Sequence, residues 1–200
     1  EHKDEEDDHG RLSMWRAYGA QTGVALVMNN HPFVTPSDAL NAWTTPVAYI
    51  RGVEVIDQLD AIATALESHA QLLGEITRSD FLDPVFQMLL FAAVSIKHIG
   101  FEEEREWRVV YLPLAYPSAR LEEDHVVIGG VPQPIFKIPL VNYPEEGFTG
   151  AEPHELINRI IIGPTQFPIA VRSTFLALLH ELGVPDPASK VVCSGIPLRC

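Results

Sequence analysis

The most constraining feature of the sequence is a charged run that leads directly into an apolar one. Residues 101–108 read Phe-Glu-Glu-Glu-Arg-Glu-Trp-Arg, and residues 109–112 read Val-Val-Tyr-Leu. Side chains of a strand alternate between its two faces, and here both faces become apolar after the charged run. A strand that is apolar on both faces is typical of the middle of a sheet. The sequence therefore predicts an internal strand over 104–112, with Trp107 and Tyr111 buried.

Such a strand would place Glu104, Glu106 and Arg108 on one face, at the edge of a buried core. Desolvation and repulsion between like charges can raise the pKa of a carboxyl group there, as in many catalytic sites. The alternative is a solvated strand end whose glutamates and arginines pair with neighbouring strands, because ion-pair networks produce the same pattern.

Composition limits the class of protein. The chain has 200 residues, 46% of them hydrophobic and 20% charged, which is enough for a sizeable core in one domain. No apolar run reaches the roughly 18 residues that a membrane span needs, so we expect no membrane partner. The net charge is −13, of which residues 1–8 contribute −5 through six acids and one lysine. The remaining −8 disfavours a broad basic surface for nucleic acid but leaves room for a local basic groove.

The two ends of the chain give further expectations. Cys193 and Cys200 are separated by six residues, which matches neither a zinc-binding pair nor a Cys-x-x-Cys redox motif. The acidic start lacks the basic and then apolar pattern of a secretory signal, which favours a cytoplasmic location. Residues 1–10 are expected to form an acidic loop. Because the chain opens on charged residues without an initiator methionine, we also expect a natural N-terminal portion before it.

Hydrophobic periodicity predicts a mixture of strands and helices. A long helix is expected over 55–73, where apolar residues follow the helical period and Gly74 gives a stop. A second, buried helix is expected from Asp83, an N-cap followed by Pro84 at the first helical position. The remaining expected elements are a helical turn at 12–18, strands at 24–28, 46–53, 125–128, 135–140, 156–162 and 190–192, and a helix at 168–182.

The sequence lacks several familiar catalytic motifs. His154-Glu155 and His180-Glu181 begin like a zinc-protease helix, but the fourth residue after each histidine is asparagine or valine. There is no phosphate-binding glycine loop, dinucleotide-binding glycine motif or nucleophile elbow. The eight histidines show no ligand spacing, so we expect no metal centre.

A second string of chemically active side chains lies at residues 12–19, Leu-Ser-Met-Trp-Arg-Ala-Tyr-Gly. Ser13 provides a hydroxyl, and Trp15 and Tyr18 provide aromatic faces. With the fixed cation of Arg16, this set can hold a nucleotide by stacking and phosphate pairing. The alternative is that the aromatic residues pack in the core while Arg16 bridges to a carboxylate of the Glu-rich strand. We expect Trp15 or Arg16 to contact the face formed by the glutamates, because the two strings would otherwise be unexplained.

Together the two strings resemble a widespread bacterial family of unknown function. Its members carry a Ser-Met-Trp-Arg-x-Tyr-Gly box and, later, a Glu-x-Glu-Trp-Arg box. Here the first box is residues 13–19, followed by Gly-Val-Ala-Leu at 23–26, and the second is residues 104–108, preceded by Lys97. The agreement spans roughly residues 1–162. The initial Glu-His is similar to the end of the family's Ser-Leu-Ser-Glu-His strand, which implies a strand and a helix before it.

The layout of that family is similar to ADP-ribosyltransferases, in which the last Glu of a Glu-x-Glu strand stabilises a cationic transition state on the nicotinamide ribose. The resemblance implies that NAD is the substrate, that Glu106 is the catalytic carboxylate, and that Glu104 positions the acceptor. The residues that it implies for binding the nucleotide are Ser13, Trp15, Arg16, Tyr18 and Lys97. The acceptor would be a protein or a nucleic acid, and the biological role that of a bacterial effector or defence toxin.

We therefore expect one α+β domain over residues 1–200, with a central, mostly antiparallel sheet flanked by about three helices. The leading function is that of an NAD-using ADP-ribosyltransferase-like domain. One alternative is a non-catalytic binding or sensor module that uses a cleft between Trp15 and Glu106. Another is a carboxylate-pair hydrolase of a nucleoside or sugar, because Glu104 and Glu106 would lie about 6.6 Å apart along a strand, which permits a water between them. The sequence does not specify an oligomeric state.

Overall fold

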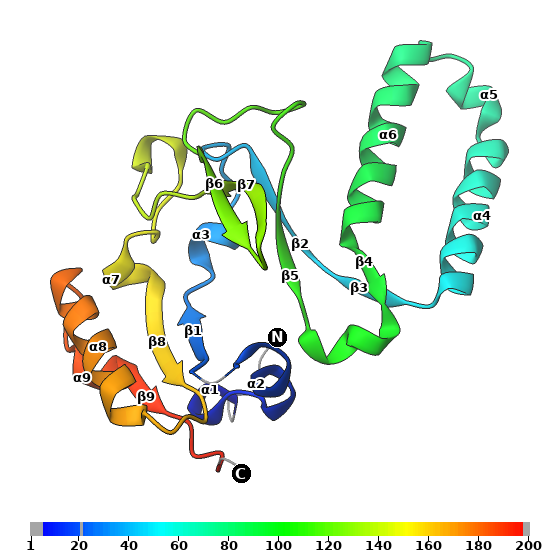
Figure 1. The fold of residues 1–200 in the computed structure, drawn as a ribbon. Helices are drawn as coiled ribbons and strands as arrows, with labels where there is room; N and C mark the ends of the chain where they lie inside the picture. The colour runs from blue at the N-terminus through cyan, green and yellow to red at the C-terminus, as the bar shows by residue number, and fades with distance from the viewer. Residues whose placement is uncertain (1–5, 21, 198–200) are drawn as a thin grey trace. The chain divides into compact units, whose positions relative to one another are not determined.

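The computed structural model describes residues 6–20 and 22–197. The chain divides into two compact units, of which unit 1 comprises Glu1–Ala42 with Tyr111–Cys200 and unit 2 comprises Trp43–Val110. Helices and several small, mostly antiparallel sheets confirm the expected α+β class (Figure 1). The strands of the described residues are divided among four small sheets instead of one central sheet. Within those residues, no helix has the length and apolar character that crossing a membrane requires.

The main core of unit 1 lies between a three-stranded sheet and one helix. Strand β1 (Val24–Met28) pairs antiparallel with β8 (Ile157–Ile162), and β8 pairs in parallel with β9 (Val191–Cys193). Residues of α8 (Pro168–Glu181) pack against β8 and β9. The helix contributes apolar side chains at the helical period, and the strands contribute theirs from one face of the sheet. The buried members of this core are Ile160, Ile162, Leu179, Val184 and Val191.

Short elements complete unit 1. They are α1 (Glu6–His9), α2 (Leu12–Tyr18), α3 (His31–Val34), the 3-10 turn η2 (Pro144–Glu146), α7 (Pro153–Leu156) and α9 (Pro187–Lys190). Strands β6 (Glu122–Ile128) and β7 (Val131–Lys137) form an exposed antiparallel hairpin. Its turn is Gly129-Gly130, whose φ angles of 58° and 83° suit a two-residue turn that follows the twist of the strands.

The described part of the expected acidic loop is a helical turn instead. Two of the acids of helix α1 are paired with arginines elsewhere in unit 1. Glu6 accepts from Arg11 at 2.8 Å, and Asp8 accepts from Arg159 at 2.9 Å. These pairs reduce the repulsion that would open an isolated acidic turn. Residues 1–5 of the expected loop lie outside the described residues.

Unit 2 is built around two pairs of strands. Strand β2 (Ala42–Pro46) pairs with β5 (Trp107–Tyr111), and their end residues Ala42 and Tyr111 belong to unit 1. Strand β3 (Ala48–Ile50) pairs in parallel with β4 (Ile96–His98). Parallel neighbours need a long crossover. The crossover here consists of α4 (Gly52–Ser68), α5 (Ala70–Leu73) and α6 (Arg78–Ser95), and the 3-10 helix η1 (Ile99–Glu104) connects β4 to β5.

The prediction of a Glu-rich internal strand over 104–112 is wrong for its first residues, 104–106. Residues Ile99–Glu104 form η1, Arg105 has a left-handed φ of 46°, and the strand begins only at Trp107. The His98 side chain accepts from the Gly100 N–H at 3.1 Å and so caps the start of the turn. Among the described residues β5 pairs only with β2, and Trp107 is 54% exposed instead of buried.

The second expected helix begins earlier and is less buried than its sequence indicates. Thr77 caps α6 by accepting from the Asp80 N–H at 3.3 Å, so the helix starts at Arg78 and Pro84 lies inside it. A threonine cap followed three residues later by an acid is a strong start signal, and it takes precedence over the cap predicted at Asp83. No described side chain of α6 is buried.

The core of unit 1 gives a direct test of the fold. Leu179 is 1% exposed, whereas its neighbour Leu178 is 45% exposed. We expect Leu179→Ala to lower the free energy of unfolding of unit 1 by about 2–5 kcal/mol, since it leaves a cavity in a packed core. Leu178→Ala should change it by less than about 1 kcal/mol. Chemical denaturation of both variants measures the difference, and equal losses would contradict the packing of α8 on the sheet.

Candidate functional site

The charged residues of the second box gather around one lysine in unit 2. Lys97 comes from β4, Glu104 from the end of η1, Glu106 from the residue before β5, and Arg108 from β5. We call these four residues the Glu106 network. The turn at Arg105 brings the two glutamates toward Lys97, although they are not on the extended strand that the sequence predicts.

Glu106 is the centre of the network. Lys97 Nζ donates to Glu106 Oε2 at 2.9 Å and also to Glu104 Oε2. Arg108 Nε donates to Glu106 Oε1 at 2.6 Å, and its Nη2 donates to Oε2 at 3.3 Å. Both carboxylate oxygens of Glu106 therefore have a cationic donor. The four side chains carry two positive and two negative charges, which cancel.

The backbone around Glu106 is held by residues far away in the sequence. Its N–H donates to the Tyr49 hydroxyl at 2.6 Å, and its carbonyl accepts from the Val47 N–H at 3.0 Å. Arg108 Nη1 donates to the Val94 carbonyl at the end of α6. The Lys97 ammonium also lies 4.8 Å from the centre of the Phe101 ring, a favourable cation–π distance. These contacts fix both the main chain and the charged groups.

The electrostatics of Glu106 are opposite to those expected from the sequence. Hydrogen bonds from Arg108 and then Lys97 lower the pKa of Glu106 from 4.5 to about 2, against a smaller opposing effect of burial. The glutamates in turn raise the pKa of Lys97 and of Arg108. The expected rise in carboxyl pKa is therefore wrong for Glu106, because the two cations outweigh desolvation. The network side chains are 15–28% exposed, so solvent reaches them.

This arrangement limits what Glu106 can do chemically. A carboxyl group with a pKa near 2 is ionised at neutral pH and cannot act there as a general acid. It can accept hydrogen bonds and stabilise positive charge. Lys97 and Arg108 can also donate hydrogen bonds to an anionic group of a ligand. That group would have to compete with the Glu106 carboxylate for both cations.

The first box lies on α2 in unit 1. Trp15 Nε1 donates to the His9 carbonyl at 2.9 Å, and its half-buried ring lies against two glycines. A Cβ atom on Gly10 would be 2.5 Å from the ring, and one on Gly163 would be 2.7 Å from it. Trp15 thus attaches α2 to the neighbouring main chain, as the packing interpretation of this string predicts for Trp15. That interpretation is wrong for Tyr18, which is 68% exposed instead of packed in the core.

The other predicted binding residues of α2 differ in their exposure. Ser13 is half-buried, whereas Arg16 and Tyr18 are exposed. The structure brings together Lys97, Glu104 and Glu106 of the predicted site, all in unit 2. The α2 residues belong to unit 1, so the predicted contact of Trp15 or Arg16 with the glutamates stays a prediction.

Sequence reasoning missed two contributors to the site. Tyr49 holds the Glu106 N–H across 57 positions of the sequence, and the Val94 carbonyl holds Arg108. No local pattern marks either residue. The pairing of Glu106 with Arg108 had a signal, because the two lie two positions apart and carry opposite charges.

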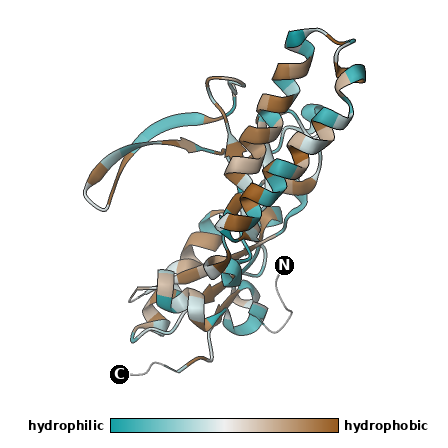
Figure 2. Cartoon of the chain, turned by 90° about the vertical axis from the view of Figure 1, so that its right-hand side faces the viewer, coloured by the Kyte–Doolittle hydropathy of each residue, from teal (hydrophilic) through white to brown (hydrophobic). Residues whose placement is uncertain are grey.

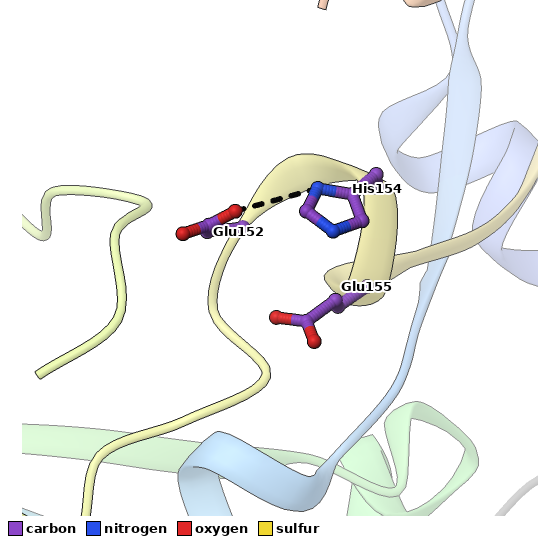
Figure 3. Close-up of side chains that lie close together, drawn as sticks. All are labelled: Glu152, His154 and Glu155. Atoms are coloured by element: carbon purple, nitrogen blue, oxygen red, sulfur yellow. Dashed lines mark ion pairs between the residues drawn. The ribbon is translucent and has the colours of Figure 1, made fainter. Parts of the chain in front are cut away.

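A separate group of side chains of the types that commonly ligate metals lies at the start of α7. The ligand atoms of Glu152, His154 and Glu155 lie within 4.8 Å of one another, and Figure 3 shows Glu152 and His154 pointing toward each other. His154 Nδ1 is 3.5 Å from Glu152 Oε2, and Glu155 Oε2 accepts from Asn142 at 2.8 Å. These are ordinary surface contacts, and on their own they do not indicate a metal centre.

The pKa of Glu106 gives a prediction for the network. In the parent chain the Glu106 carboxylate should titrate near pH 2, so its stabilising effect on unit 2 is complete above about pH 4.5 and is lost as the pH falls through about 2. Lys97→Met should move this pKa upward, toward 4.5, because one of two cationic partners is removed. Carboxyl chemical shifts measured by NMR across this range test both statements.

A matched control is available in unit 1. Lys137 forms an exposed ion pair with Asp124 in the β6–β7 hairpin, so Lys137→Met also removes one paired ammonium. That variant should leave the Glu106 titration unchanged. A parent chain in which Glu106 titrates near 4.5 would show that the network does not form in solution.

The comparisons with known proteins agree with an uncharacterised domain. No curated protein and no solved structure gives a significant match to the chain. One family matches it, described as "Protein of unknown function (DUF2971)", and the match covers residues 14–109. That range contains most of the first box and all of the second, including every residue of the Glu106 network. A domain of unknown function, similar to this family, is thus found over residues 14–109.

Proposed function

We propose that unit 2 carries the reaction site of an NAD-using, ADP-ribosyltransferase-like domain, with Glu106 as the catalytic carboxylate. The observation that carries the proposal is the association of Lys97, Glu104 and Glu106, three residues that the resemblance implies for the site, in one partly exposed network in which Glu106 is ionised at neutral pH. A carboxylate that is always charged can stabilise a cation, and stabilisation of developing charge is often the largest catalytic effect.

The reaction has a simple balance. The bond between the nicotinamide nitrogen and ribose C1′ breaks, and its electron pair leaves with nicotinamide, which becomes neutral. Positive charge then develops on the ribose, where the Glu106 carboxylate stabilises it. A nucleophile of the acceptor bonds to C1′ and releases its proton to solvent. No general acid is needed for the leaving group, which fits a carboxyl group that stays ionised.

The cations of the network provide a way for NAD to enter. Without substrate, Lys97 and Arg108 neutralise Glu106. The pyrophosphate of NAD is a second anionic partner for these cations, since its oxygens suit both an arginine and a lysine. In this proposal the pyrophosphate takes over part of the pairing with both cations, so that a Glu106 oxygen becomes available to the ribose. Glu104, which shares Lys97, then positions the acceptor, a protein or a nucleic acid.

The first test replaces the charge of Glu106 and keeps its shape. Glu106→Gln should remove most NAD turnover, by about 10²–10³-fold, because a neutral amide cannot stabilise a cationic transition state. The matched control is Glu103→Gln, an exposed residue of η1 outside the network, which should retain near-parent activity. The assay is NAD consumption by the full chain with labelled NAD and cell lysate as the source of acceptors. Equal turnover by the parent and Glu106→Gln would rule out the carboxylate role.

The predicted nucleotide-binding residues of α2 need a test of their own. Arg16 is exposed, so Arg16→Ala should leave the fold intact. If it pairs with a phosphate of NAD, the variant should raise KM about tenfold with a smaller effect on kcat. An unchanged KM would remove Arg16 from the binding site and leave the assignment of Glu106 standing.

A non-catalytic binding or sensor module is the second candidate. It is favoured by the engagement of both Glu106 oxygens, which describes a closed structural network as well as a resting active site. In that case a folded parent chain should show no NAD turnover with any acceptor, and Glu106→Gln should lower the midpoint of thermal unfolding of unit 2. The carboxylate-pair hydrolase has less support, because it needs one protonated carboxyl group, whereas the pKa of Glu106 is lowered and Glu104 is ion-paired with Lys97.

A further inference from the structure

The crossover of unit 2 is a pair of helices with little burial. Helices α4 and α6 run antiparallel and side by side in Figure 1 and in Figure 2. One apolar stripe of each helix is half-buried and marks the side on which they face each other. This stripe consists of Val55, Ile62 and Leu66 of α4 and Phe81 and Val85 in the first half of α6. Toward the end of α6, Leu90, Phe91 and Val94 are half-buried on other sides of the helix, with Phe91 against Trp43. No described residue of either helix is fully buried.

Each helix also carries a second, exposed apolar stripe. On α6 it consists of Leu82, Phe86 and Leu89, and Phe86 is 66% exposed. On α4 it includes Ile56, which is 60% exposed, and Val53. Figure 2 shows hydrophobic stretches recurring along both helices. A helix that is apolar on more than one side normally has a second neighbour.

The two exposed stripes lie on the same face of the helix pair. Successive residues of an α-helix are rotated by about 100°. On α4, Ile56 is rotated about the helix axis away from the half-buried stripe. On α6, Phe86 is rotated away from its half-buried stripe by a similar angle and in the same direction. Because the helices are antiparallel, equal rotations bring both residues to one side. We call this side, with Ile56, Leu82, Phe86 and Leu89, the hairpin face.

The charge of the helix pair decides what can cover this face. Residues 52–95 contain seven acidic residues and one arginine, a net charge of −6 with histidine neutral. Asp60 and Glu67 of α4 are rotated to the same side as Ile56, so they border the hairpin face. A second copy of the chain would bring −6 against −6, and an anionic membrane surface would be repelled likewise. The acidic border suits a cationic partner.

We propose that the hairpin face docks a basic amphipathic helix of another protein. The apolar side of that helix packs on Phe86 and Leu89, and its Lys or Arg residues lie along α4 beside Asp60 and Glu67. The result is a three-helix arrangement in which α4 and α6 each gain a second neighbour. About 17 partner residues, or roughly 26 Å of helix, match the length of α4. The inference concerns a surface without any residue of the Glu106 network and is independent of the proposed reaction.

The probe is a synthetic 18-residue helical peptide with a leucine stripe bordered by lysines. Its counterpart has glutamate in place of each lysine and the same leucines. Binding to the full chain is measured by fluorescence anisotropy. The lysine peptide should bind and the glutamate peptide should not, and raising the salt concentration should weaken the complex.

Matched variants place the peptide on the hairpin face. Phe86→Ala should weaken binding about tenfold. Leu72→Ala, at a residue 61% exposed in α5 and outside the face, should leave it unchanged. Asp60→Lys should weaken binding several-fold. Glu75→Lys, with the same charge change at an exposed residue between α5 and α6, should weaken it less. Equal effects within each pair would show non-specific attraction to an acidic chain and overturn the proposal.

Two further outcomes would assign the face to another occupant. A dimer in light scattering that becomes a monomer in Phe86→Ala would show that a second copy covers it. With Cys193 and Cys200 replaced by serine, a thiol introduced by Phe86→Cys should react rapidly with maleimide in the free chain and slowly with the peptide bound. Slow reaction in the free chain would show that the face is already covered, and either result would refute docking of a separate basic helix.

Discussion

The interaction on which unit 2 depends is the bridging of two carboxylates by one ammonium group. In the parallel pair of β3 and β4, Tyr49 and Lys97 are register partners. Tyr49 accepts from the Glu106 backbone, and Lys97 donates to the Glu106 side chain. One pair of neighbouring residues therefore holds both ends of Glu106. Without Lys97 the two glutamates would repel each other, and the tight turn at Arg105 that brings them together would be unfavourable.

Elements whose apolar residues recur at the period of a helix or a strand could be predicted from the sequence. The turn predicted at 12–18 coincides with α2, and β1 and α8 begin where the sequence predicts them. In each case a run of apolar residues at one period ends at or just before a glycine or an asparagine, so local preference and tertiary packing agree. Ion pairing of the glutamates was one of the two alternatives that the sequence left open, but it did not identify Lys97 as the shared partner of Glu104 and Glu106.

The remaining features depend on partners that have no local signature. Tyr49 is 57 positions from Glu106, and only the crossover of α4 and α6 makes the two meet. The sequence pattern of the Glu-rich segment predicted a strand. The cap at His98 and the ion pair between Lys97 and Glu104 favour a 3-10 turn instead. The sequence also predicted the wrong direction for the Glu106 pKa shift. An extended strand places the two glutamates on one face, and the prediction did not include the ion pairs that both form with Lys97.

The junction of α6 and β4 has a mechanical consequence. The helix ends at Ser95 and the strand starts at Ile96, so the chain passes from one to the other without a loop. Val94, in the last turn of the helix, holds Arg108, and Lys97 follows three residues later. A tilt or axial rotation of α6 therefore moves the supports of both cations at once. The geometry of the ion pairs at Glu106 is thereby tied to the orientation of a helix of 18 residues.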